Sequence, residues 1–137
     1  MPTIRPSRLL TAALWLDIAG SAPVALAQVL AADRLSPLLQ LPQPLLFQTG
    51  LVMTAYVGLL LWLVRRPRLP LLLLRAVIVG NGAWALLAAG LMVSLAPGAT
   101  GLLFLALHLA PALFAVLQQA GLKRSTRGGP ALLGAAG

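Results

Sequence analysis

The stretch LPLLLLRAVIVGNGAWALLAAG, residues 69–90, reads as a membrane span interrupted by a charge. A helix needs about 20 mostly apolar residues to cross the hydrocarbon core of a bilayer, and this stretch is long enough. Arg75 and Asn81 stand inside it, where a polar side chain is costly unless another group pairs with it. The fold therefore depends on how many such spans the chain has, and on which polar residues meet between them.

The composition is that of an integral membrane protein. Of the 137 residues, 60% are hydrophobic and only 9% are charged, whereas soluble domains are about 45–50% apolar and about 25% charged. The net charge of +8 comes from basic residues clustered beside apolar runs, which is how membrane topology is encoded, and we do not read it as a nucleic-acid surface. The chain has no cysteine, which excludes disulfides and thiolate chemistry.

The sequence predicts an all-α bundle of four transmembrane helices. The spans are expected at residues 9–32, 45–64, 69–95 and 101–122, so that residues 1–122 form one membrane domain and residues 123–137 a basic, flexible tail. In the first connection, Ser36 and Pro37 could begin a short interfacial helix that Pro42 and Pro44 would stop, or the segment could be a plain loop.

The basic residues predict the orientation of this bundle. With four crossings, eight of the ten fall on one side and only Arg34 falls on the other, beside Asp33. By the positive-inside rule both termini are then cytoplasmic. The excess of Arg over Lys in an Ala- and Leu-rich chain suggests a bacterial origin, and hence the inner membrane. The residues expected to determine the topology include Arg65, Arg66, Arg68, Lys123 and Arg124, together with Arg5, Arg8 and Arg127.

An alternative interpretation of the first span is a cleaved signal peptide. Residues 1–28 have a basic start, an apolar middle and Ala25-Leu26-Ala27 as a cleavage pattern. Asp17 argues against this interpretation, because the apolar region of a signal peptide is normally uncharged. Cleavage would also leave only three spans.

Arg75 is predicted to pair with Asp17. At about 1.5 Å per residue, Arg75 lies about 8 Å into the third span and Asp17 about 12 Å into the first, and both helices start from the same side. We therefore expect a buried ion pair that fixes two helices in register. In the alternative, the Arg75 side chain extends to the cytoplasmic surface and Asp17 is protonated or hydrated.

Two further patterns predict how the helices meet. Ala13, Asp17, Ser21 and Gln28 share one face of the first span, which we expect to pack inward. Small residues at a spacing of four predict close helix packing. These residues are Gly50, Thr54 and Gly58 in the second span and Gly80, with Ala76, in the third.

A polar layer is expected near the middle of the membrane. Its candidate members are Tyr56, Asn81, His108 and Gln28, either as a pocket with His108 as proton acceptor or ligand, or as a structural hydrogen-bonded layer. The inward face of the fourth span is predicted to carry His108, Ala112, Ala115 and Gln119. Pro111 leaves the carbonyl of Leu107 without its helical partner, which predicts a kink.

The sequence contains no catalytic motif, so no enzyme activity is expected. With one histidine and no second strong ligand at metal spacing, neither a metal nor a cofactor is predicted. The carboxylate in the first of four short spans is similar in layout to small multidrug transporters, although pairing with Arg75 would occupy it.

The stretch RAVIVGNGAW, residues 75–84, and the four-span layout resemble the uncharacterised four-helix integral membrane proteins of bacteria, the broad group that includes DoxX-like proteins. This resemblance implies a link to respiratory or quinone chemistry by analogy alone. The function we expect is that of an accessory or structural membrane subunit. The alternative is a small transporter or a lipophilic-ligand-binding protein that uses the polar layer. Expected partners are the lipid bilayer and a larger membrane complex or a second copy of the chain, and no nucleic acid.

Overall fold

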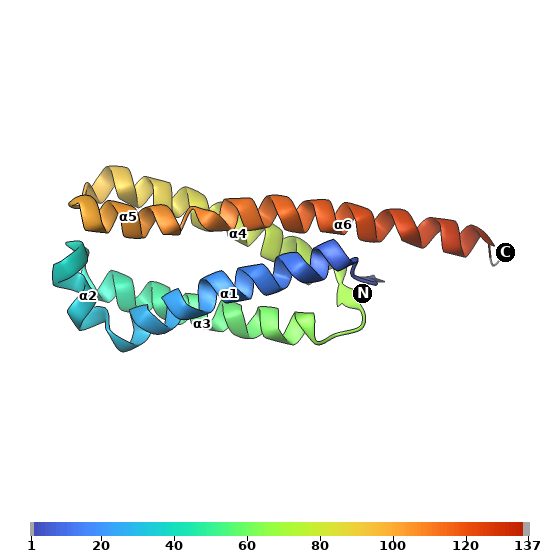
Figure 1. Ribbon diagram of the computed structural model, residues 1–137, viewed down its shortest axis with the longest axis horizontal. Coiled ribbons are helices and arrows are strands. Elements are labelled where there is room, and N and C mark those ends of the chain that lie inside the picture. Colours follow the sequence, from blue (N-terminus) through green and yellow to red (C-terminus); the bar gives the residue numbers. More distant parts are fainter. Residues whose placement is uncertain (1, 136–137) are drawn as a thin grey trace.

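The protein is a bundle of long, roughly aligned helices in a computed structural model that describes residues 2–135, with side chains up to residue 127 (Figure 1). Two very short strands accompany the helices. The elements in chain order are β1 (Thr3–Ile4), α1 (Arg8–Leu30), α2 (Ala32–Leu39), α3 (Gln43–Val64), β2 (Leu69–Pro70), α4 (Leu71–Leu95), α5 (Ala99–Leu107) and α6 (Ala110–Ala135).

Four segments are long and apolar enough to cross a membrane, namely α1, α3, α4 and the stretch that combines α5 with the first part of α6. The outer surface is apolar, with Val93 83%, Leu30 77% and Leu86 76% exposed. Polar side chains lie inside instead, as Asp17 and Gln118 do with no exposed surface. This inside-out distribution is that of a multi-pass membrane protein and confirms the predicted four-helix bundle.

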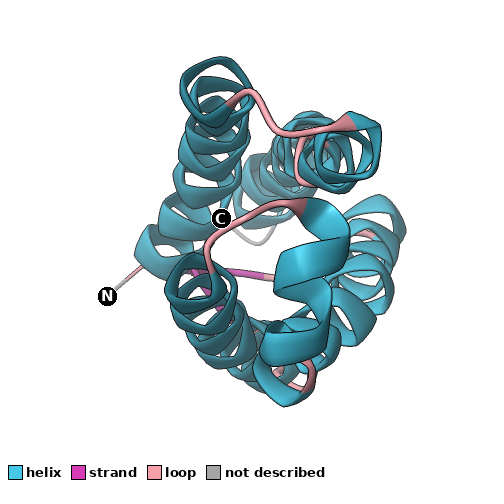
Figure 2. Cartoon of the chain, turned by 90° about the vertical axis from the view of Figure 1, so that its left-hand side faces the viewer, coloured by secondary structure: helices cyan, strands magenta, loops and turns pink. Residues whose placement is uncertain are grey.

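The long helices form two layers, α1 with α3 and α4 with α5 and α6 (Figure 1). Helix α1 packs against α3 and α6, and α4 packs against α6, whereas α3 and α4 hardly touch. The view along the bundle in Figure 2 shows the helices side by side around a common axis. The wide spacing of α3 and α4 leaves room between them, although Tyr56 of α3 reaches Asn81 of α4.

Close approach of helices depends on glycines that were only partly predicted. A Cβ atom at Gly50 would lie 2.7 Å from the Cβ of Gln28, and one at Gly121 would lie 2.7 Å from the backbone of Leu10. These glycines let α3 and α6 approach α1. The packing role predicted for Thr54, Gly58 and Gly80 was wrong, because all three are exposed and a Cβ at either glycine would meet no atom within 4 Å.

Both ends of the described chain lie at the same end of the bundle (Figure 1). Strand β1 pairs antiparallel with β2, so that Thr3 faces Pro70 and Ile4 faces Leu69. The hydroxyl of Ser7 caps α1 by accepting from the amide of Leu10 and donates to the carbonyl of Gly121. The three predicted basic groups therefore gather at one end of the molecule.

The fourth span is broken where Pro111 predicted a kink, and this prediction is confirmed. Helix α5 ends at Leu107 and α6 begins at Ala110. At the break, the amides of His108, Leu109 and Ala112 bond to carbonyls three residues earlier instead of four. This tighter turn accommodates the proline, which has no amide hydrogen.

The element bounds differ from the predicted ones at two places. Helix α2 begins at Ala32, so the first connection contains a full short helix and is not a plain loop. Helix α6 continues to Ala135, past the point after residue 122 where the tail was predicted to begin. Lys123 and Arg124 are good helix formers, so the span extends through them without a break.

Candidate functional site

Five side chains from the four spans meet at one buried carboxylate, and we call this group the Asp17 cluster. Its members are Asp17 and Ser21 from α1, Tyr56 from α3, Asn81 from α4 and Gln118 from α6. Ser21 donates to Asp17 Oδ1 over 3.0 Å. Tyr56, Asn81 and Gln118 donate to Asp17 Oδ2 over 2.6, 2.9 and 2.8 Å. The carboxylate thus receives four hydrogen bonds from uncharged groups.

The bonds within this cluster also connect its donors to one another. Asn81 Nδ2 donates its second hydrogen to Gln118 Oε1 over 3.0 Å. The Tyr56 hydroxyl lies 2.6 Å from Asp17 Oδ2 and 3.0 Å from Asn81 Oδ1, and it has a single hydrogen to donate. The shorter contact is typical of a hydroxyl that donates to a charged carboxylate. The cluster therefore links all four spans through one carboxylate group.

The predicted ion pair between Asp17 and Arg75 was wrong. The side chain of Arg75 is exposed on the outside of α4, and no ion pair joins it to Asp17 among the described residues. The inward face of α4 is formed by Leu74, Val77 and Asn81. Arg75 follows Leu74 by one residue, about 100° around the helix, and so points away from α1.

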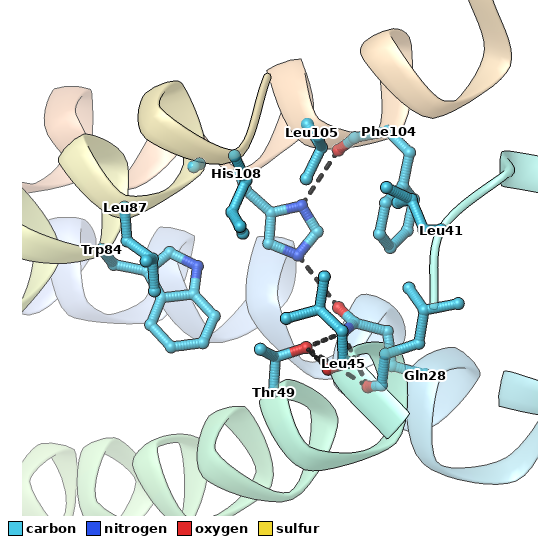
Figure 3. Close-up of a pocket in the computed structure, with 12 residues that line it drawn as sticks. Gln28, Leu41, Leu45, Thr49, Trp84, Leu87, Phe104, Leu105 and His108 are labelled. Atoms are coloured by element: carbon cyan, nitrogen blue, oxygen red, sulfur yellow. Dashed lines mark hydrogen bonds between the residues drawn. The ribbon is translucent and has the colours of Figure 1, made fainter. Parts of the chain in front are cut away.

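A second buried group, the His108 cluster, lies at the break in the fourth span (Figure 3). It consists of Gln28 from α1, Thr49 from α3 and His108. Gln28 Nε2 donates to the carbonyl of Leu46 over 3.0 Å and to Thr49 Oγ1 over 2.7 Å. Gln28 Oε1 lies 2.9 Å from His108 Nε2, while His108 Nδ1 lies 2.9 Å from the carbonyl of Phe104.

Both ring nitrogens of His108 face oxygen acceptors. The Leu46 carbonyl fixes the nitrogen end of the Gln28 amide, so the amide oxygen must point at the ring. A neutral imidazole has one N–H and can donate to only one of its two partners. The arrangement is fully satisfied only when the ring carries two N–H groups, because turning the Gln28 amide over would place its oxygen against the Leu46 carbonyl.

The four residues predicted to form one polar pocket are thus divided between the two clusters. Tyr56 and Asn81 lie side by side in the Asp17 cluster and both donate to Asp17, and Gln28 and His108 are in contact in the His108 cluster. No hydrogen bond joins the two clusters among the residues with described side chains.

The glutamine that completes the Asp17 cluster was missed. The inward residue of the fourth span is Gln118, with no exposed surface, whereas the predicted Gln119 is exposed. Ala112 is exposed as well. The prediction assumed that one regular helix runs from His108 to Gln119. The tight turn at residues 108–109 instead rotates the residues after it around the helix axis, so that a different residue faces inward. The proline that predicted the kink was the available signal for this shift.

A cavity of about 240 Å³ opens between α3 and α4, beside the Asp17 cluster. Its lining is mostly apolar, and its polar side chains are Ser21, Tyr56, Asn81 and Trp84. An adjoining hollow of about 190 Å³ reaches His108 and the kink, and it shares Ser21, Met53, Trp84 and Pro111 with the first. The two polar clusters therefore border one connected region of the bundle interior.

Trp84 is the aromatic residue common to this region. It lines both hollows and also the small cavity around the His108 cluster (Figure 3). Its ring lies 6.3 Å from that of His108, centroid to centroid. Among the residues with described side chains no hydrogen bond involves its indole N–H, and this nitrogen is not a fully buried atom. A donor without a partner in a nonaqueous environment is available to an acceptor atom of a ligand.

The described residues contain no group of three or more His, Asp or Glu side chains that could hold a metal ion. No protein family, no curated protein and no solved structure matches this chain. The functional argument therefore depends on the two clusters and the cavity beside them.

Proposed function

We propose that this protein binds a small, uncharged lipophilic molecule inside the membrane, in the cavity between α3 and α4. The observation that carries the proposal is the position of the cavity. It opens where the backbones of α3 and α4 are widely spaced, so that a molecule could enter sideways from the lipid phase. An apolar cavity with a few fixed polar groups is the usual form of a small-molecule site.

The size of the cavity limits the ligand. An engineered cavity of about 150 Å³ is large enough to bind benzene, and this cavity has about 240 Å³ with a further 190 Å³ adjoining it. One or two rings, or a short branched chain, match this space better than a whole two-chain phospholipid does.

The polar lining indicates the chemistry of the ligand. Ser21, Tyr56 and Asn81 already donate to Asp17, so they offer few free hydrogens. The Trp84 indole is the donor that remains without a partner. The favoured ligand therefore carries an acceptor oxygen, such as a ketone or ether, and no charge.

Benzophenone is a suitable probe, because it is an uncharged aromatic ketone that crosslinks to nearby C–H bonds on illumination. We expect saturable labelling at Met53, which lines both hollows. The variant Gly80→Leu should reduce this labelling at least fivefold by filling the opening beside α4. The control Gly90→Leu lies on the same helix with equally open surroundings and does not line the cavity, so it should label normally.

A second comparison tests the hydrogen bond. Trp84→Phe keeps an aromatic ring and removes the N–H, so it should weaken benzophenone binding while leaving the labelled position unchanged. Trp15, which is 49% exposed, provides the control Trp15→Phe. Labelling that does not saturate, or that is equal in Gly80→Leu and Gly90→Leu, would contradict a binding site. The role of accessory subunit, with a larger partner in place of a ligand, would then be favoured.

The proposed location is the bacterial inner membrane with both termini in the cytoplasm, supported by the basic groups at the end where β1 and β2 meet. Because the chain has no cysteine, single-cysteine variants can report orientation. Ser125→Cys should be protected from an impermeant thiol reagent in intact cells, and Ser36→Cys should react.

A further inference from the structure

The end of the bundle that holds β1 and β2 contains a hollow of about 430 Å³, separate from the cavity between α3 and α4. It lies between the N-terminal segment and the connection from α3 to α4. Its lining residues are Thr3, Arg5, Arg66, Pro67, Arg68 and Pro70. Two segments distant in the sequence are fixed together here by the strand pairing and by a hydrogen bond from the Leu71 amide to the carbonyl of Pro2.

The strand register brings positive charges together. Thr3 faces Pro70 and Ile4 faces Leu69, so the next residues in this register, Arg5 and Arg68, come opposite each other. Like charges at opposed positions destabilise a strand pair. The guanidinium of Arg66 adds a third charge and is held 3.9 Å above the ring of Trp62. Three arginine residues from two distant segments thus line one hollow.

The chain has no acidic side chain available to neutralise them. It contains only two, and Asp17 is buried in its own cluster within the membrane interior. The other, Asp33, lies in α2 at the opposite end of the bundle (Figure 1). An anion bound in this hollow would therefore come from outside the described residues.

We propose that this hollow binds the phosphate of an anionic phospholipid headgroup. It lies where α3 ends at Val64 and α4 begins at Leu71, which is the level at which a membrane span meets the headgroups. Trp62, near the end of α3, is 41% exposed, as an interfacial aromatic residue would be. Arginine binds phosphate through paired N–H groups, and a phosphate between Arg5 and Arg68 replaces their repulsion with attraction.

The test compares two ways of removing the same charge. The protein and its variants are placed in nanodiscs that contain phosphatidylcholine and phosphatidylglycerol of equal chain length, and retained lipids are counted by native mass spectrometry. Arg5→Gln with Arg68→Gln removes two charges from the hollow. Lys123→Gln with Arg124→Gln removes two charges from the same end outside the hollow.

We expect the unmodified protein and the α6 double variant to retain one phosphatidylglycerol preferentially. The hollow double variant should lose that preference about tenfold. Equal loss in both double variants would mean general attraction to a basic surface and would overturn the site. Retention of phosphatidylcholine as readily as phosphatidylglycerol would overturn it as well.

Two further arms complete the experiment. The single variant Arg66→Gln removes an exposed side chain and should weaken the preference by itself, so the test does not depend on the double variant folding. Inorganic phosphate at millimolar concentration should not displace the retained lipid. Displacement would show that the hollow binds free phosphate, which would overturn the lipid assignment.

Discussion

The two buried polar clusters have opposite arrangements of hydrogen-bond donors and acceptors. In the Asp17 cluster, hydroxyl and amide donors from four spans surround a single acceptor group. In the His108 cluster, oxygen acceptors lie on both sides of a ring that has one or two hydrogens to give. In the first cluster four donors reach one carboxylate, whereas the second is complete only in one protonation state of the ring. We infer that the first mainly fixes the bundle and that the second can change.

Their positions in the backbone support this distinction. Asp17, Tyr56, Asn81 and Gln118 all lie within regular helix. His108 lies between α5 and α6, where the hydrogen-bond pattern already departs from the helix. A small movement at such a break costs less than one within a helix. The cavity borders both clusters, so a bound ligand would contact a rigid wall at Ser21 and an adjustable wall at His108.

The largest effect is expected from removing the acceptor of the Asp17 cluster. Asp17→Leu would leave four buried donors without their partner, and interhelical hydrogen bonds in membranes contribute about 0.6 kcal/mol each, with maxima near 1.7. We expect the free energy of unfolding to fall by about 2–4 kcal/mol. A denaturation titration in detergent micelles measures this change.

Asp17→Asn sharpens the same comparison. The amide keeps one acceptor oxygen but places a donor among donors, so the loss of stability should be roughly half that of Asp17→Leu. Asp33→Asn, which changes an exposed carboxylate in α2, is the matched control and should leave unfolding unchanged. Equal stability of Asp17→Leu and the unmodified protein would show that the cluster does not hold the bundle together.

Adjacent glutamines in α6 give an intermediate effect. Gln118 donates to Asp17 and accepts from Asn81, while Gln119 is exposed. Gln118→Leu should lower the free energy of unfolding by about 1–2 kcal/mol, and Gln119→Leu should change it by less than about 0.5 kcal/mol. The same denaturation titration applies to both. A larger effect at Gln119 would mean that the helical phase after the kink differs from the one described.

The His108 cluster should respond to pH. When His108 is protonated, both ring contacts are hydrogen bonds. When it is neutral, the ring must lose one contact unless the Gln28 amide turns. The ¹⁵N signals of the ring and of the Gln28 side-chain amide should therefore change with the same midpoint.

The cavities on either side of the His108 ring are lined by no other titratable side chain, so no second ionisation should complicate the curve. Thr49→Val is a useful control, because it removes one partner of the Gln28 amide while leaving both ring contacts in place. A ring that titrates while the Gln28 amide signals stay constant would contradict the coupling.

Most of the fold could be predicted from the sequence because it depends on long apolar runs and on prolines. The four spans and the kink before Pro111 follow from these features alone. The inward face of α1 was also predicted correctly, since Asp17, Ser21 and Gln28 are all buried. Within one regular helix, residues three or four positions apart reliably lie on the same face.

The site could be predicted only in part, since it depends on which side chains face inward in several helices at once. Tyr56 and Asn81 were expected near each other, and their side chains do lie within 3.0 Å and donate to the same carboxylate. Gln118 was missed because the kink altered the phase of the fourth span. Opposite charge suggested Arg75 as the partner of Asp17, but uncharged donors from three other helices satisfy a buried carboxylate equally well.

Arg75 should therefore give the smallest effect of all. Its exposed side chain has no part in the Asp17 cluster, so Arg75→Gln should change the free energy of unfolding by less than about 0.5 kcal/mol. The same substitution in the Asp17→Asn background should cause the same small change, because residues that do not interact have additive effects. A double-mutant cycle in detergent measures this coupling directly. A coupling well above 0.5 kcal/mol would mean that the arginine turns inward in the membrane, and it would restore the ion pair that the exposed position of Arg75 rules out.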